Sequence, residues 1–232
     1  MFGDVLIASC SVTYLGPFLG SFRAKAIFEV WLPLLKEKEI LASENFDLIK
    51  ILGEQIKVQE WLMLGLPNEN VSIENVIMMN EQMESKWPLL IDPQGQAFSF
   101  LKNRISDVEI LKMTDPGYNK MLESCVQMGK AVIFENVEPE MDPAIMPLVL
   151  RDFTVSGKSV TVKLNDVNFE VSSDFKLYLV SNMSYPHFKP EVQSKTSLCN
   201  FAITMDGLQQ QLLSLVCYNE NKKDEEKRDQ LI

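Results

Sequence analysis

The sequence predicts an α/β fold with a mainly parallel sheet, and three observations lead to that prediction. Short apolar runs alternate along the chain with stretches of helical periodicity, a pattern typical of parallel strands joined by helices. One apolar run is followed by a turn and then a helix start, which is the layout of a phosphate-binding loop. The chain has 232 residues, 46% apolar and 23% charged, which fits one large globular domain with a helical appendage.

The N-terminal part of the chain predicts two helices. Residues 5–15 carry apolar side chains at helical spacing, and Gly16 with Pro17 ends that stretch. Residues 21–38 carry a second apolar stripe, which Pro33 interrupts. Because little else is available to cover the first apolar helix, we expect it to pack on something outside this sequence.

Three further helical pieces and a polar linker precede the phosphate-loop-like segment. Residues 43–53 begin with a helix-start signal, residues 58–64 form a short apolar piece, and residues 70–80 predict a helix capped by Ser72. Residues 81–86 are polar and read as a linker.

Residues 87–102 contain the phosphate-loop-like segment. Set against the pattern G-x-x-x-x-G-K-[ST], Asp92 replaces the first glycine, Ala97 the second and Phe98 the lysine. Ser99 keeps the hydroxyl position and Gly95 is an interior glycine. The candidate loop residues are Asp92, Pro93, Gln94, Gly95, Gln96, Ala97, Phe98 and Ser99.

These substitutions predict a loop that does not bind ATP. A phosphate loop combines a nest of backbone amides with the positive charge of a lysine, and Phe98 removes that charge. Lys102 lies one helical turn further on, about 6 Å along the axis, and is a poor substitute. Asp92 and Glu135 add negative charge, and at an effective dielectric constant of ~20 one unit pair ~5 Å apart is worth roughly 3 kcal/mol.

Two more strands and a helix follow the loop. Residues 108–113 predict the second strand, and residues 118–128 predict a helix that Gly129 closes. Residues 130–137 predict the third strand, which in a phosphate-loop ATPase ends in Asp-Glu to hold magnesium and activate water. Here Glu135 and Asn136 stand in those places, and Asn136 cannot act as a base.

The rest of the chain predicts a helix, a hairpin, a fourth strand and a last helix. Residues 143–153 read as the helix, and residues 157–171 alternate as a hairpin that turns at Asn165-Asp166. The strand, residues 175–182, ends at Asn182, where such ATPases place a polar sensor, although this signal alone is generic. Residues 204–232 read as the last helix.

Composition excludes several classes of function. The net charge of −10 argues against a nucleic-acid or anionic-membrane partner, because either favours a basic face. Four scattered cysteines and a single histidine, His187, give no recognisable metal site and no disulfide framework. Residues 5–19 are apolar but too short to span a bilayer. We therefore predict no metal ligand, and the substitutions in the phosphate-loop-like segment predict no catalytic residue.

Several segments resemble dynein heavy chains, specifically the fifth AAA+ module of the motor ring. The heptapeptide Ile-Asp-Pro-Gln-Gly-Gln-Ala is the most specific of them. The matching segments are Gly3-Asp4-Val5-Leu6, Tyr14-Leu15-Gly16-Pro17-Phe18, Trp87-Pro88-Leu89-Leu90-Ile91-Asp92-Pro93-Gln94-Gly95-Gln96-Ala97, Glu135-Asn136-Val137, Met141-Asp142-Pro143, Asn182, Pro186-His187, Pro190-Glu191-Val192, Asn200-Phe201 and Gly207-Leu208-Gln209.

The resemblance implies a fold and a division of the chain. The fold is an AAA+ phosphate-loop-type three-layer sandwich with a mainly parallel five-stranded sheet, N-terminal helices and a β-hairpin insert. In such sheets we expect the loop-bearing strand between the third and fourth strands. Residues 1–40 are then helices leading in from the stalk side, residues 41–205 the degenerate large subdomain, and residues 206–232 a helix towards a small helical lid that this sequence lacks. AAA+ nucleotide sites lie between the large subdomain and that lid.

The resemblance also implies a function. This module is regarded as a non-catalytic ring member, a structural and coupling element for microtubule-based movement. Its partners are then neighbouring AAA+ modules of the same heavy chain, the linker, and the stalk and strut elements, with the microtubule reached only through the parent motor and its coiled-coil stalk. No cofactor is expected here, and ATP and magnesium belong to other modules. The expected location is the cytoplasm and cytoskeleton, in the axoneme of a cilium or flagellum.

The resemblance further predicts where a neighbour-directed arginine should be. Such modules donate it from the helix after the fourth strand, which corresponds to residues 194–200. That stretch has no arginine, and Lys195 reads as an ordinary exposed lysine. Residues 98–101 are also less polar than in relatives, which favours a divergent, axonemal isoform.

Two alternatives remain open at this stage. One is an active but atypical phosphate-loop ATPase module, supported by Ser99, Gly95, Glu135 and Asn182. The other is an unrelated α/β binding protein that imitates the pattern.

Overall fold

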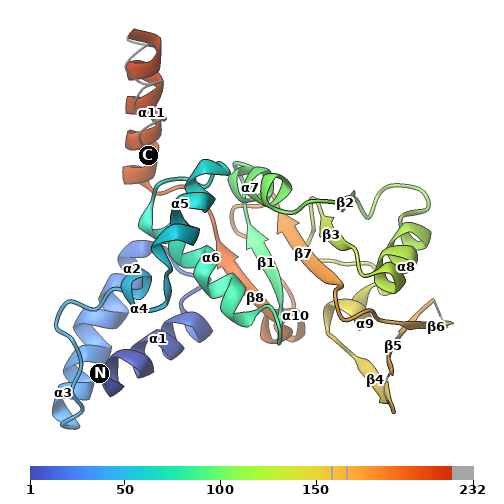
Figure 1. The fold of residues 1–232 in the computed structure, drawn as a ribbon, viewed down its shortest axis with the longest axis horizontal. Coiled ribbons are helices and arrows are strands. Elements are labelled where there is room, and N and C mark those ends of the chain that lie inside the picture. The colour runs from blue at the N-terminus through green and yellow to red at the C-terminus, as the bar shows by residue number, and fades with distance from the viewer. Residues whose placement is uncertain (158, 166, 221–232) are drawn as a thin grey trace.

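The structure is a computed structural model that describes residues 1–157, 159–165 and 167–220, and its centre is a parallel sheet (Figure 1). Five strands pair in the order β2-β3-β7-β1-β8, and every pairing is parallel. The strands are β1 (Trp87–Ile91), β2 (Val108–Leu111), β3 (Ala131–Phe134), β7 (Lys176–Ser181) and β8 (Thr196–Asn200). The predicted α/β class and the mainly parallel five-stranded sheet are confirmed.

The fifth strand, β8, lies where we expected a helix. Helix α10 (Pro190–Lys195) ends immediately before it, and β8 then pairs with β1 over its whole length, from Trp87 opposite Thr196 to Ile91 opposite Asn200. Residues 196–200 are a short polar segment without helical periodicity, and pairing with β1 decides their conformation. The expected helix at residues 194–200 is therefore wrong.

The position of the loop-bearing strand also differs from the expectation. Strand β1 lies between β7 and β8, which are the fourth and fifth strands of the sheet in chain order. The expected place between the third and fourth strands is wrong, because β3 and β7 pair directly with each other.

Helices cover both faces of the sheet and complete three layers. One face packs on α1 (Phe2–Tyr14), α4 (Leu48–Leu52), α5 (Gln55–Met63), α6 (Asn70–Gln82) and α7 (Gln96–Arg104). The other packs on α8 (Tyr118–Met128), α9 (Met146–Val149) and part of a second sheet. Successive residues of β1 alternate between the faces, with Leu89 in one apolar cluster and Leu90 in the other. The three-layer AAA+ arrangement is confirmed.

The N-terminal segment is helical as predicted, with more subdivisions. After α1, the second stretch runs through α2 (Gly20–Ala24), the π-helical η1 (Lys25–Trp31) and α3 (Leu32–Glu37). Pro33 does not end the helical run: it lies at the start of α3, directly after the π-helical η1, where the backbone changes from π-helical to α-helical. Between α1 and α2, the Gly16 oxygen accepts a bond from the Asn200 N–H at 2.9 Å. A Cβ at Gly16 would lie 2.2 Å from the Leu198 oxygen, so only glycine allows this close approach.

The predicted cap of α6 is wrong. The helix begins at Asn70 after an extended N-cap residue, Glu69, and Ser72 is buried inside the first turn. By contrast, α8 has the predicted bounds, and Gly129 closes it in the left-handed conformation with φ 75°.

A second, antiparallel sheet contains the predicted hairpin. Strands β5 (Ser159–Leu164) and β6 (Val167–Glu170) form it, and β4 (Phe153–Ser156) adds a third strand. The helix expected over residues 143–153 is wrong except for α9, because Arg151 adopts a left-handed φ of 52° and turns the chain into β4. Asn165 of the predicted turn has φ 48°, and Asp166 lies outside the described residues.

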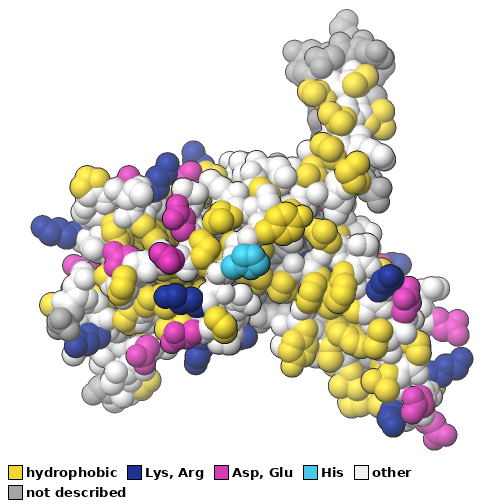
Figure 2. All heavy atoms as spheres, turned by 180° about the vertical axis from the view of Figure 1, so that it is seen from behind, with side chains coloured by type: hydrophobic (Ala, Val, Ile, Leu, Met, Phe, Trp, Pro, Cys, Tyr) yellow, Lys and Arg dark blue, Asp and Glu magenta, His cyan; other side chains and the backbone are white. Residues whose placement is uncertain are grey.

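The last helix, α11 (Met205–Glu220), projects from the rest of the molecule (Figure 1). Residues 221–232 of the predicted helix lie outside the described residues. Hydrophobic side chains gather along α11 and over the N-terminal helices (Figure 2). In the part of the chain that the structure describes, no helix has the length and apolarity needed to cross a membrane.

Candidate functional site

The candidate site is the loop between β1 and α7, at the carboxyl edge of the parallel sheet. Gly95 is the N-cap of α7 and has φ 72°, a left-handed conformation. A Cβ there would meet no atom within 4 Å, so the backbone angle and not space makes glycine favourable. The strand–loop–helix layout of a phosphate loop is therefore present.

The amides of this loop are already bonded to a carboxylate of the chain itself. Asp92 is 0% exposed, and its Oδ1 and Oδ2 accept bonds from the Gln96 N–H at 2.9 Å and the Phe98 N–H at 2.8 Å. The Asp92 N–H donates to the Ser181 oxygen at 2.8 Å, which anchors the loop on β7. Asp92 thus occupies the start of α7, where a phosphate loop holds its anion.

Two opposing effects act on this carboxyl group. Desolvation is the larger and raises the pKa of Asp92, while the bonds from the amides of Phe98 and Gln96 act to lower it. The interactions that favour the charged form of Asp92 are therefore hydrogen bonds from backbone amides of the loop.

The other loop residues are engaged locally. Phe98 is half-buried and packs against the apolar cluster under α7, and Ala97 is fully buried in that cluster. The Ser99 hydroxyl donates to the Gly95 oxygen at 2.8 Å. Lys102 is exposed one turn further along α7. Gln94 is exposed, and its Oε1 lies 3.4 Å from the Ile203 N–H.

The candidate residues after β3 and β7 lie at the same edge of the sheet. Glu135 forms an ion pair with Lys112 at 3.4 Å, across the ends of β3 and β2. Asn136 is exposed with a left-handed φ of 58°, and Asn182 is exposed just after β7. Val137, which follows Asn136, donates its N–H to the Val180 oxygen at 2.8 Å. The loop after β3 is therefore also hydrogen-bonded to β7.

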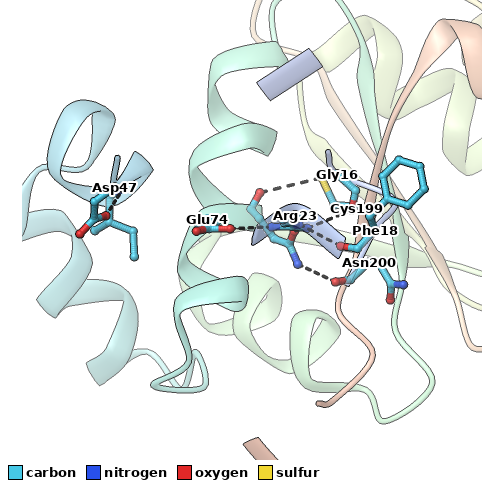
Figure 3. Close-up of polar contacts among 9 residues, drawn as sticks. Gly16, Phe18, Arg23, Asp47, Glu74, Cys199 and Asn200 are labelled. Carbon is cyan, nitrogen blue, oxygen red and sulfur yellow. Dashed lines mark hydrogen bonds and ion pairs between the residues drawn. The ribbon is translucent and has the colours of Figure 1, made fainter. Parts of the chain in front are cut away.

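Sequence reasoning missed a buried arginine in α2, in the N-terminal helical segment. Arg23 is 3% exposed, and its guanidinium donates to the Phe18 oxygen at 2.9 Å, the Gly16 oxygen at 3.1 Å and the Glu74 carboxylate at 2.9 Å (Figure 3). Burial raises the pKa of Glu74, and the Arg23 charge opposes that rise. The only signal in the sequence was a lone arginine within an apolar helical stretch.

A second missed contact joins α8 to the loop after β3. The Tyr118 hydroxyl donates to the Asp142 carboxylate, which also accepts the Ala144 N–H at 2.9 Å. Desolvation and this bond raise the pKa of Tyr118 to about 12, and the same bond lowers the pKa of Asp142. Tyr118 is the first residue of the predicted helix and Asp142 lies in a segment noted only for its resemblance, so the local pattern gave no sign that the two side chains meet.

The described residues contain no cluster of three or more His, Cys, Asp and Glu side chains placed to hold a metal ion. His187 is exposed, and Cys10, Cys125 and Cys199 are free thiols.

Comparison with known proteins places the chain in a family. Residues 59–232 match the family described as the ATP-binding dynein motor region. Over 99% of this chain, it is 39% identical to dynein axonemal heavy chain 3 of Mus musculus, and over 100% it is 36% identical to dynein axonemal heavy chain 1 of Rattus norvegicus. It is 33% identical over 99% to the dynein-1-beta heavy chain, flagellar inner arm I1 complex, of Chlamydomonas reinhardtii.

The chain spans only 5 to 6% of the length of these relatives. The family match covers most of the chain, and the parallel sheet with its loop after β1 agrees with an AAA+ module. The chain therefore belongs to the ATP-binding dynein motor region family.

Proposed function

We propose that this chain is a non-catalytic module, the fifth, in the AAA+ ring of an axonemal dynein heavy chain. Its role is structural and coupling: it relays conformational change between neighbouring modules during microtubule-based movement. The observation that carries the proposal is the Asp92 carboxylate on the Gln96 and Phe98 amides, where a nucleotide phosphate would bind.

A nucleotide entering this loop would have to compete with a built-in anion. Displacing Asp92 would leave its carboxylate buried without partners, and retaining it would oppose a second negative charge. At an effective dielectric constant of ~20, like charges ~5 Å apart repel by roughly 3 kcal/mol. Phe98 supplies no compensating positive charge at the lysine position. Both terms disfavour ATP.

The ring context is part of this proposal and rests on the family resemblance, with the heavy-chain names of the relatives in support. Partners are then the neighbouring AAA+ modules of the same heavy chain, the linker and the stalk and strut elements, and the microtubule is reached only through the parent motor. ATP and magnesium act at other modules of that motor. Its location is the axoneme of a cilium or flagellum, as the names of the relatives support.

Such a module would transmit its neighbours' nucleotide states as a rigid body, by repacking at its interfaces. Two features support a rigid module. The Asp92 N–H bond to Ser181 and the apolar cluster that contains Ala97 hold the loop on the sheet without a ligand.

Isothermal titration of this chain with Mg-ATP tests the proposal. The expected result is no binding heat at millimolar nucleotide. Binding at micromolar concentration would overturn the proposal and support the atypical ATPase, for which Ser99, Glu135 and Asn182 would supply the polar groups.

A restored loop provides the matched control. The triple variant Asp92→Gly, Ala97→Gly, Phe98→Lys reinstates the phosphate-loop pattern, and far-ultraviolet circular dichroism checks that it folds. We expect it to bind Mg-ATP more tightly than the original chain, because the self-supplied anion is gone and the lysine charge is present.

A further inference from the structure

The start of α11 is fastened to α6 by a three-residue contact. The Thr204 hydroxyl donates to the Glu69 carboxylate at the N-cap of α6, and accepts the Gly207 N–H at 3.1 Å. A Cβ on Gly207 would lie 2.8 Å from Glu69 Oε2, so the helix backbone rests directly on this carboxylate. Thr204 therefore caps α11 and ties it to the body at the same time.

The degenerate loop and the end of β1 also bind the residues just before α11. The Gln94 side-chain oxygen accepts the Ile203 N–H at 3.4 Å, one residue before Thr204. The Phe201 N–H donates to the Ile91 oxygen at 2.8 Å, which continues the pairing of β8 with β1. Residues 201–204 are thus bonded to both the end and the loop of the strand that carries the phosphate-loop pattern.

The inner end of the segment is fixed to the N-terminal turn. Asn200 donates to the Pro17 oxygen at 3.2 Å, and its side-chain oxygen accepts the Ala202 N–H at 2.9 Å. Asn75 donates to the Asn200 oxygen at 2.6 Å. Asn75 also bonds the buried Arg23, which holds the turn around Gly16. Polar contacts therefore hold this segment at both ends, at Asn200 near the N-terminal turn and at Thr204 at the start of α11.

These contacts lie at the base of α11, where the helix leaves the body of the molecule. The helix projects from the molecule, and Leu208, Leu212 and Leu213 on it are 38%, 53% and 64% exposed (Figure 1). The contacts of residues 200–207 therefore act directly on the direction in which α11 leaves the body.

We propose that residues 200–207, here named the α11 strap, hold α11 in one orientation by contacts within the chain and without nucleotide. In the AAA+ arrangement a nucleotide lies between the large subdomain and the small helical lid. Here Gln94 and Glu69 connect the sheet-bearing body to the residues at the start of α11, and they do so as protein side chains. The inference rests on the proposed function in one respect, namely that no nucleotide supplies the bridge.

Hydrogen exchange of this chain, read by mass spectrometry on peptides covering residues 200–210, tests the strap. Thr204→Val keeps the side-chain shape and removes the hydroxyl that bonds Glu69 and Gly207. The informative amides are Ile203 and Leu208, because their own acceptors, Gln94 Oε1 and the Thr204 backbone oxygen, remain. We expect their exchange to accelerate about tenfold, with that of β1 and β7 unchanged.

Thr13→Val is the matched control, since the Thr13 hydroxyl donates only within α1, to the Ser9 oxygen at 2.7 Å. It should leave exchange of residues 200–210 unchanged. Unchanged protection of Ile203 and Leu208 in Thr204→Val would overturn the strap, and so would an equal acceleration throughout the chain. Binding of Mg-ATP in isothermal titration would instead overturn the proposed function, whatever the exchange shows.

Discussion

Two acidic residues at one edge of the sheet have opposite surroundings. Asp92 follows β1, is fully buried and accepts bonds from two helix amides. Glu135 follows β3, has a side chain 27% exposed, and pairs with a Lys112 side chain that is 48% exposed. The first is part of how the loop folds, whereas the second forms an ordinary surface ion pair. An acidic residue near a phosphate-loop pattern can therefore be either a buried acceptor that the loop needs to fold or a surface ion-pair partner, and burial of the side chain distinguishes the two.

Removing the buried carboxylate should have the largest effect. Asp92→Ala leaves the Gln96 and Phe98 amides without their acceptor, and buried unsatisfied amides cost about 1–3 kcal/mol each. We expect the free energy of unfolding, from urea denaturation, to fall by about 3 kcal/mol. Asp92→Asn keeps an acceptor oxygen and should lose less. Equal stability of Asp92→Ala and the original chain would show that the loop does not depend on this carboxylate.

The loop after β3 has a partly buried contact of its own, between Tyr118 and Asp142, and removing it should have an intermediate effect. Tyr118→Phe deletes the hydroxyl that donates to Asp142 while keeping the ring against Phe134. Loss of a hydrogen bond to a charged group should lower the free energy of unfolding by about 1.5 kcal/mol.

Alkaline titration followed by ultraviolet absorbance gives an independent measurement on the same contact. The pKa of Tyr118 is raised to about 12 from 10.0, and burial also raises the pKa of Tyr178, so the original chain should show late-ionising tyrosines that include Tyr118. In Tyr118→Phe the late step should be smaller by the absorbance of one tyrosine, and the part that belongs to Tyr178 should remain. Because the folded value is the higher one, the contribution of Tyr118 to stability is complete below pH 10 and is lost as the pH rises towards 12.

The contributions of Asp92 and Asp142 to the free energy of unfolding should change in opposite directions as the pH is lowered. The pKa of Asp92 is raised above 3.8 by burial, so its contribution to stability decreases as the pH rises from 3.8 through the folded value. The pKa of Asp142 is lowered, mainly by Tyr118, so its contribution is present above 3.8 and is lost as the pH falls through the folded value.

Urea denaturation between pH 3 and 7 checks both signs. The stability difference between the original chain and Asp92→Asn should shrink as the pH rises, and the difference from Asp142→Asn should grow. Slopes of the same sign for the two pairs would contradict the assigned causes. The effect is smaller than that of deletion, because only part of each group's free energy varies with pH.

Features set by the local sequence pattern could be predicted, whereas features set by contacts with distant residues could not. Apolar periodicity located β1, β3, β7 and α8, and the motif comparison located Asp92–Ser99 as a degenerate loop. Local pattern did not identify β8, because residues 196–200 become a strand only by pairing with β1. It also missed the turn at Arg151, whose left-handed backbone leads into β4.

The role of Asp92 was only half predicted. Its negative charge was read from the sequence as a repulsion towards nucleotide, but its bonds to the Gln96 and Phe98 amides depend on how the loop closes. Arg23 and Tyr118 were missed for a related reason, because their partners Glu74 and Asp142 come from segments 51 and 24 residues away.

Substitution of the partly exposed Glu135 should have the smallest effect on the free energy of unfolding. Glu135→Gln removes the charge that pairs with Lys112 and keeps the size of the side chain. Because both partners are partly solvated, the free energy of unfolding should change by less than about 0.5 kcal/mol, and even less at high salt. A loss comparable with that of Asp92→Ala would mean that Glu135 is as deeply built into the fold as Asp92, and the distinction between the two loops would fail. A change confined to stability, with Mg-ATP binding still absent, would leave the non-catalytic role unaffected.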